Sequence, residues 1–167
     1  MTIESVLVSS VMTKNVKTVS ENQIIRTAAE MMDKAGIGSI VIVRNAGIPS
    51  GIITERDIVR IVSSPGASFE QPLSTVMKTP VITGDVMMSL KDALQTMQTR
   101  DIRRLPIMEN GKMVGIVTDK DIFRAILKSL PMVTDLIDQN LPVDYRPVYQ
   151  RLSEFMVGEI NSHPGGR

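Results

Sequence analysis

The residues best suited to chemistry in this chain are a threonine and an aspartate that occur together twice, three positions apart. Residues 51–57 read Gly-Ile-Ile-Thr-Glu-Arg-Asp, and residues 115–121 read Gly-Ile-Val-Thr-Asp-Lys-Asp. A carboxylate accepts hydrogen bonds from two neighbouring hydroxyls, and a threonine hydroxyl adds one more. Such a pair can hold the 2′- and 3′-hydroxyls of a ribose. The candidate ribose-binding residues are Thr54, Asp57, Thr118 and Asp121.

The same spacing also has a purely structural explanation. A threonine followed three residues later by an acid, at the start of a helix, is close to a capping box, in which the threonine caps the helix and the acid reaches back to the backbone. From spacing alone the capping interpretation is the more common one, and a residue can both cap and bind. The helix N-terminus beside the pair favours a phosphate through its free N–H groups and its dipole.

Two adjacent arginines are the other candidates for ligand chemistry. Arg103 and Arg104 stand just before an apolar run, and their planar guanidinium groups suit phosphate oxygens, although a basic pair is often only solvated surface charge. The place that corresponds to them before residues 51–57 holds Gly38 and Ser39. We therefore expect two unequal clefts, with the one served by the arginines preferring the more anionic ligand. Secondary phosphate candidates, for which helix-surface charge is the favoured alternative, are Arg56 and Lys120.

The motif recurs because a larger segment is duplicated. Thr118 follows Thr54 by 64 positions, whereas Met77 in Val-Met-Lys-Thr follows Met12 in Val-Met-Thr-Lys by 65. The one-residue difference fits an insertion in the turn between two strands, where it does least damage. A unit this small seldom buries enough apolar surface alone. We therefore expect the two copies to pack on each other and to form two related clefts, which are natural places for ligands.

Apolar periodicity predicts the elements of the first copy. Residues 22–35 carry a helical stripe of apolar side chains, with Ser20 as the expected N-cap and Gly36 as the residue just past the helix end. Short β-branched runs then predict two strands before helical spacing returns. The expected ranges are 39–43 and 51–54 for the strands, 44–47 for the turn between them and 55–63 for the second helix.

The second copy repeats this order. The expected elements are a helix over 89–99, strands over 105–108 and 113–118, and a closing helix over 119–128. Asn110 and Gly111 between the two strands are a strong hairpin signal. Pro106 has no N–H to donate to a ladder, so we expect it at the start or edge of its strand.

Composition and pattern divide the chain into three parts. A Ser/Pro/Gly-rich linker lies at 63–68, and the repeat is lost after Pro131. Beyond it we expect a short helix over 132–140 and an amphipathic helix over 147–160 that caps the core or contacts a second subunit. The expected organisation is a first repeat over 8–66, a second repeat over 73–128 and a C-terminal helical extension over 129–167.

Composition also narrows the class of protein. With 43% hydrophobic residues, 22% charged residues and a net charge of +1, the chain suits a globular unit with little electrostatic attraction to nucleic acid or anionic membrane. It has no cysteine, and its one histidine lies in a Gly/Pro-rich tail, so we expect no metal site and no catalytic triad. No apolar run reaches the roughly 20 residues that span a bilayer. No signal peptide is visible, so we expect a cytoplasmic protein.

These features together resemble the cystathionine-β-synthase-type (CBS) domain, present as a tandem pair that is often called a Bateman module. The resemblance covers about residues 8–128. It rests on the two Val-Met-Thr/Lys openings, the helices with Ala28 and Ala93, the block Ile-Arg-Arg-Leu-Pro-Ile at 102–107 and the two Thr-x-x-Asp endings. It implies an α/β (α+β) fold of two β-α-β-β-α repeats, packed through their sheets with approximate two-fold symmetry.

The resemblance also implies a non-catalytic regulatory module that binds an adenosine-containing ligand such as AMP, ADP, ATP or S-adenosylmethionine. The nucleotide would be a regulatory ligand, with no cofactor required. Family members commonly pair as homodimers, and the regulated partner would be a separate chain. Both copies would line the adenine pocket, with Thr18 and Thr83 facing the ligand most and core packing as the alternative for most of the set. The set is Val16, Thr18, Ile37, Ile40, Val81, Thr83, Ile102 and Pro106.

Two other classes of function stay open. A scaffold for protein interactions, with empty or vestigial clefts, is favoured by the missing arginines of the first copy and disfavoured by the presence of Asp57 and Asp121. An enzyme comes third because no histidine or cysteine is placed to act. We expect neither nucleic acid nor membrane as a partner.

Overall fold

The computed structural model describes residues 5–44 and 47–128. The chain divides into two units, Met1–Ile122 and Phe123–Arg167. The two copies of the duplicated segment are called repeat 1 and repeat 2 below; the first unit contains repeat 1 and repeat 2 as far as Ile122. The helices expected over 132–140 and 147–160 lie outside the described residues.

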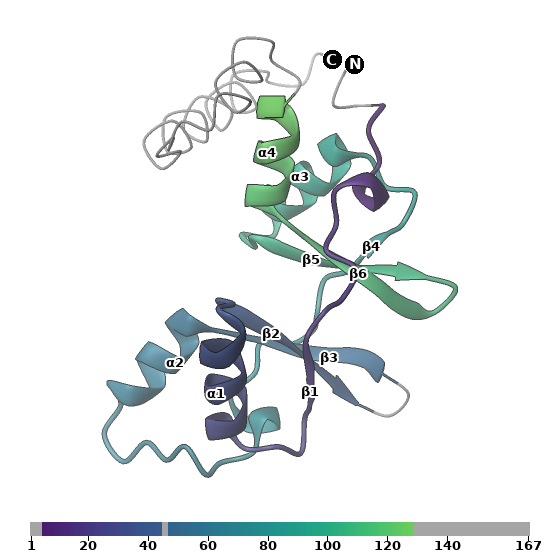
Figure 1. The fold of residues 1–167 in the computed structure, drawn as a ribbon. Coiled ribbons are helices and arrows are strands. Elements are labelled where there is room, and N and C mark those ends of the chain that lie inside the picture. The colour runs from purple at the N-terminus through teal and green to yellow at the C-terminus, as the bar shows by residue number, and fades with distance from the viewer. Residues whose placement is uncertain (1–4, 45–46, 129–167) are drawn as a thin grey trace, which may run out of the picture. The chain divides into compact units, whose positions relative to one another are not determined.

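Repeat 1 is a three-stranded sheet with two helices (Figure 1). Its elements in chain order are β1 (Thr18–Ser20), α1 (Ile25–Ala35), β2 (Ser39–Arg44), β3 (Ile48–Thr54) and α2 (Glu55–Val62). The strand order is β1-β2-β3, with β1 parallel to β2 and β3 antiparallel to it. Helix α1 contacts β2 and helix α2 contacts β3. The apolar faces of these elements enclose the core of the repeat, which includes Ile25, Ile42 and Ile53.

Repeat 2 has the same order of elements, as the duplication predicts. They are β4 (Gly84–Asp85), α3 (Leu90–Thr99), β5 (Arg104–Glu109), β6 (Lys112–Thr118) and α4 (Asp119–Lys128). The sheet order is β4-β5-β6. Residues 45–47 separate β2 from β3, whereas only 110–111 separate β5 from β6. The one-residue difference between the two offsets therefore lies in the turn between two strands, where the sequence placed it.

The opening segment of each repeat packs on the other repeat. Thr13, before β1, exchanges two backbone hydrogen bonds of 2.9 and 3.0 Å with Ile116 on β6. Lys78, before β4, exchanges bonds of 3.2 and 3.0 Å with Ile52 on β3. In Figure 1 the purple N-terminal segment accordingly runs past β6 before it enters β1. This reciprocal crossing, together with the contact between β3 and β6, confirms that the repeats pack through their sheets with approximate two-fold symmetry.

The start of α1 differs from the sequence expectation. Its N-cap position is Ile24, without a side-chain cap, and Ser20 instead ends β1. The first N–H groups of a helix need acceptors from elsewhere, and here residues 69–71, between the linker and repeat 2, supply them. The N–H groups of Ile25 and Arg26 donate to the carbonyls of Gln71 and Phe69, each at 3.0 Å. A long-range backbone contact thus replaces the local serine cap.

The place of Pro106 also differs from the expectation. It lies opposite Ile116 in β5, which is the central strand of its sheet. Ile116 directs its own N–H and carbonyl to Thr13, so this pair needs no hydrogen bond between β5 and β6. On the other side, β4 pairs only with Ile107 and Met108. A proline is therefore tolerated at this one position of a central strand.

Asp101 takes the place in repeat 2 that Gly36 takes in repeat 1. Both follow the first helix of their repeat, with φ values of 50° and 60°. Gly36 thus has the left-handed conformation that the sequence predicts, whereas a non-glycine residue is strained there. We expect Asp101→Gly to raise the free energy of unfolding by about 0.5–1 kcal/mol in urea denaturation. Asp33→Gly, within the regular part of α1, should instead lower it, and a loss of stability in Asp101→Gly would contradict this explanation.

None of the described helices is long and apolar enough to cross a membrane.

Candidate functional site

The first Thr–Asp pair lies where β3 passes into α2. The Thr54 N–H and Oγ1 both donate to Asp57 Oδ2, at 2.9 and 2.6 Å, and the Asp57 N–H donates to Thr54 Oγ1 at 3.4 Å. This is a capping box, so the structural explanation of the spacing applies here. The box fixes the orientation of the carboxylate and uses one of its two oxygens.

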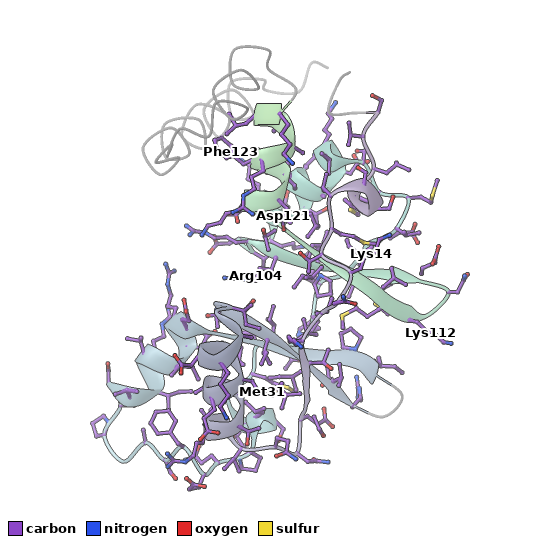
Figure 2. The ribbon with its side chains drawn as sticks, viewed as in Figure 1. Lys14, Met31, Arg104, Lys112, Asp121 and Phe123 are labelled. Carbon is purple, nitrogen blue, oxygen red and sulfur yellow. The ribbon has the colours of Figure 1, made fainter. Side chains whose placement is uncertain are left out.

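The second pair has the same geometry where β6 passes into α4. Thr118 donates to Asp121 Oδ2 from its N–H at 2.9 Å and from its Oγ1 at 2.7 Å, and the Asp121 N–H donates back at 3.2 Å. Figure 2 labels Asp121 near the start of α4. We call the two places junction 1 (Thr54, Asp57) and junction 2 (Thr118, Asp121). Each holds a preoriented carboxylate at a helix N-terminus.

A lysine that sequence reasoning missed completes junction 1. Lys78 Nζ lies 3.1 Å from Asp57 Oδ1, with the lysine side chain 57% exposed and the aspartate side chain 9% exposed. The crossing of the opening segments brings it there, because Lys78 pairs with Ile52 two residues before Thr54. The only signal in the sequence was its place in the repeated Val-Met-Lys-Thr motif, where it reads as a solvated charge.

The environment of Asp57 lowers its pKa below the ordinary value of 3.8. Burial of the carboxylate raises the pKa, but the hydrogen bonds from Thr54 and Lys78 and the charge of Lys78 together lower it by more. The folded chain thus binds a proton at Asp57 less readily than the unfolded chain. It follows that Asp57 contributes stability above its unfolded pKa, and that this contribution disappears as the pH falls through its lower folded pKa.

We therefore expect the stability of the protein to fall between about pH 5 and pH 3, partly because of Asp57. Urea denaturation across this range should give a steeper fall for the native protein than for Asp57→Asn, which carries no titrating carboxylate. Lys78→Met removes one of the two partners that lower the pKa and should reduce the slope partway. Parallel curves for the native protein and Asp57→Asn would refute the role of Asp57.

The residues predicted to bind phosphate differ in their exposure and in their contacts. Arg104 is half-buried, and its Nη2 lies 3.5 Å from the carbonyl oxygen of Gly38 in repeat 1. Figure 2 labels this residue on the side of β5 that faces repeat 1. A Cβ on Gly38 would lie 3.4 Å from Arg104 Nη2, which is ordinary contact, and closer, at 3.0 Å, to Glu55 Oε2. The side chains of the other three candidates are exposed: Arg103, Arg56 and Lys120.

The predicted adenine residues fall into three groups by exposure. Ile40 is 1% exposed and belongs to the core of repeat 1, and Pro106 is also buried. Thr83 is exposed, whereas its counterpart Thr18 is half-buried at the start of β1. The remaining residues of the set are half-buried: Val16, Ile37, Val81 and Ile102.

Comparison with known proteins places these features in a family. The CBS domain profile matches residues 8–64 and 73–128. YhcV of Bacillus subtilis, a CBS domain-containing protein, is 41% identical over 69% of this chain and 81% of its own length. Protein MJ1404 of Methanocaldococcus jannaschii is 34% identical over 95% of this chain, which spans 41% of that protein.

A solved structure extends the comparison to three dimensions. It is the CBS domain pair of protein MJ0100 in complex with 5′-methylthioadenosine and S-adenosyl-L-methionine. That chain is 27% identical to this one, with a TM-score of 0.68, and the match covers 74% of this chain and 98% of that one. The duplicated β-α-β-β-α fold, the two Thr–Asp junctions and the two profile matches all support the same family assignment. The chain therefore belongs to the CBS domain family and carries two copies of the domain in tandem.

Proposed function

We propose that this chain is a regulatory module that binds an adenosine-containing ligand, with the ribose held at the Thr–Asp junctions of its two repeats. The observation that carries the proposal is the doubly held carboxylate of each junction. One oxygen of Asp57 and of Asp121 is fixed by the capping threonine, which orients the other oxygen. A preoriented carboxylate binds a vicinal diol without first losing side-chain freedom.

The surroundings of the junctions suit the rest of an adenosine derivative. Half-buried apolar residues such as Ile37 and Ile102 stand just before β2 and β5, whose first residues pair with Thr54 and Thr118, and they provide faces for an adenine ring. The N–H groups at the start of α2 and α4 favour an anion. The complex of MJ0100 with two adenosyl compounds supports the same ligand class for this chain.

The output of such a module would be a shift between two conformational states, which requires the ligand to bind them with different affinity. We further propose that the module acts on a separate protein chain, in the cytoplasm and as a homodimer.

A protein-interaction scaffold is the second candidate, and one observation favours it. In junction 1 the second oxygen of Asp57 already pairs with Lys78, so this junction is complete without a ligand. A pure scaffold would keep both junctions as structural helix caps only.

A thermal-shift comparison tests the proposed function. Adenosine, 5′-methylthioadenosine and AMP should raise the melting temperature, since a ligand at 100 times its Kd stabilises the folded state by about 2.7 kcal/mol. Uridine and UMP should have much smaller effects. The double variant Asp57→Asn/Asp121→Asn, in which the amide can still accept a hydrogen bond from the capping threonine, should lose the adenosine response. Equal responses to adenosine and uridine compounds would reject an adenine site, and no response to any of them would favour the scaffold.

A further inference from the structure

The two junctions differ in the residue that the crossing segment brings to the aspartate. Lys78 and Thr13 occupy equivalent positions, because each exchanges two backbone hydrogen bonds with the matching isoleucine of the other repeat, Ile52 or Ile116. The lysine pairs with Asp57 at 3.1 Å. A threonine at the same place is shorter and carries no charge. The duplicated fold thus presents the same carboxylate with a cation in one junction and without one in the other.

This difference changes what each aspartate can offer to a ribose. In junction 1 both oxygens of Asp57 are used, Oδ2 by Thr54 and Oδ1 by Lys78. In junction 2 Thr118 uses Oδ2 of Asp121, and no ion pair reaches this aspartate within the described part of the chain. A diol entering junction 1 must displace the ammonium group, whereas a diol entering junction 2 meets an open carboxylate oxygen.

Moving the Lys78 ammonium group away from Asp57 costs free energy only if the ammonium group is left without an anionic partner. The side chain of Lys78 is 57% exposed, and its flexible four-carbon stem lets the charged head move without disturbing the backbone. A 5′-phosphate, across the ribose from the diol, offers the lysine a new anion towards which its flexible stem can turn. An uncharged adenosine derivative offers none, so its diol competes with Lys78 for Asp57.

We propose that Lys78 sets the ligand selectivity of junction 1. This junction accepts an adenosine derivative that carries a phosphate on its ribose, and it discriminates against uncharged ones. Junction 2, with Thr13 in place of the lysine, takes the uncharged derivatives. The inference rests on the proposed function and assigns the preference for anions to junction 1 and Lys78, whereas the sequence assigned it to the cleft served by Arg103 and Arg104.

A reciprocal exchange of the two residues tests the inference by calorimetry with adenosine and AMP. The effect of Lys78→Thr on adenosine and AMP affinity is measured in an Asp121→Asn background, which leaves junction 1 as the only complete site. It should tighten adenosine binding by about three- to tenfold and weaken AMP binding by a similar factor, given the strength of a partly exposed charged pair. Thr13→Lys, read in an Asp57→Asn background, should do the opposite at junction 2.

Lys14→Thr is the matched control, because it removes an equal charge from an exposed neighbouring position. It should leave the ratio of adenosine to AMP affinity unchanged in either background. The inference is overturned if Lys78→Thr leaves that ratio unchanged, shifts it towards AMP, or shifts it no more than Lys14→Thr does. A failure of the proposed function looks different, because no adenosine derivative would then bind to any variant, including the native protein, although circular dichroism shows each to be folded.

Discussion

Replacing Leu73 by alanine is expected to lower the free energy of unfolding by about 2–5 kcal/mol and to loosen repeat 1, although Leu73 is the first residue of repeat 2 in the chain. Leu73 is 0% exposed and lies in the core cluster of repeat 1 together with Ile25 and Ile42. Its N–H donates to the carbonyl of Gln23 at 2.8 Å. Removal of the side chain therefore leaves a cavity in the first core, which the surrounding strands cannot fully close.

Urea denaturation measures the loss of stability, and amide hydrogen exchange locates it. In Leu73→Ala the amides of β2 should lose more protection than those of β5. Val8→Ala is the matched control, because Val8 is equally buried and its N–H bonds the carbonyl of Met88 in repeat 2 at 2.9 Å. In Val8→Ala the amides of β5 should lose protection before those of β2. Loss of protection confined to β5 in Leu73→Ala would show that the opening segments do not cross.

The second large effect is expected at Gly51 and Gly115, where any side chain would strike a methionine of the crossing segment. A Cβ on Gly51 would collide with Met77 Sδ and lie 2.6 Å from its Cγ, and a Cβ on Gly115 would collide with Met12 Sδ and lie 2.9 Å from its Cγ. Overpacking of this kind typically costs about 1–3 kcal/mol. We therefore expect Gly51→Ala and Gly115→Ala each to lower the free energy of unfolding by that amount.

A double-mutant cycle distinguishes this contact from a general effect of alanine. Met77→Ala creates space beside position 51, so the pair Gly51→Ala/Met77→Ala should be less destabilised than the sum of the single changes. Gly36→Ala is the control, since a Cβ there meets nothing within 4 Å but has to adopt a φ of +60°. Its cost should be additive with that of Met77→Ala. Additivity at Gly51 as well would mean that Met77 does not pack there.

Both predictions concern the crossing, and the crossing also bears on the proposed function. The segment that carries Leu73 and Met77 into repeat 1 continues directly to Lys78, which pairs with Asp57. A ligand that moved Lys78 would therefore act on a segment that leads into β4 of repeat 2. This gives a physical route by which one junction could influence the other.

The sequence by itself determined the features that depend on neighbouring residues. The helices and hairpins follow from periodicity and turn chemistry, which act over a few positions, and the duplication and its one-residue difference follow from comparing the two copies residue by residue. The same holds for the Thr–Asp pairs, because Thr54 and Asp57 face each other across a single helical turn. The left-handed end of α1 at Gly36 is equally local. Such features are read correctly because the residues that make them are close together in the chain.

Only the tertiary structure decided which distant residues meet. The N–H groups that start α1 are bound by Gln71 and Phe69 rather than by Ser20, and Pro106 fits a central strand because Thr13 takes the hydrogen bonds of Ile116. The partner of Asp57 is Lys78, and Arg104 reaches Gly38. Periodicity shows which face of a strand is apolar, but not which segment will lie beside it. That choice depends on the path of the whole chain, and here the path exchanges the opening segments of the two repeats.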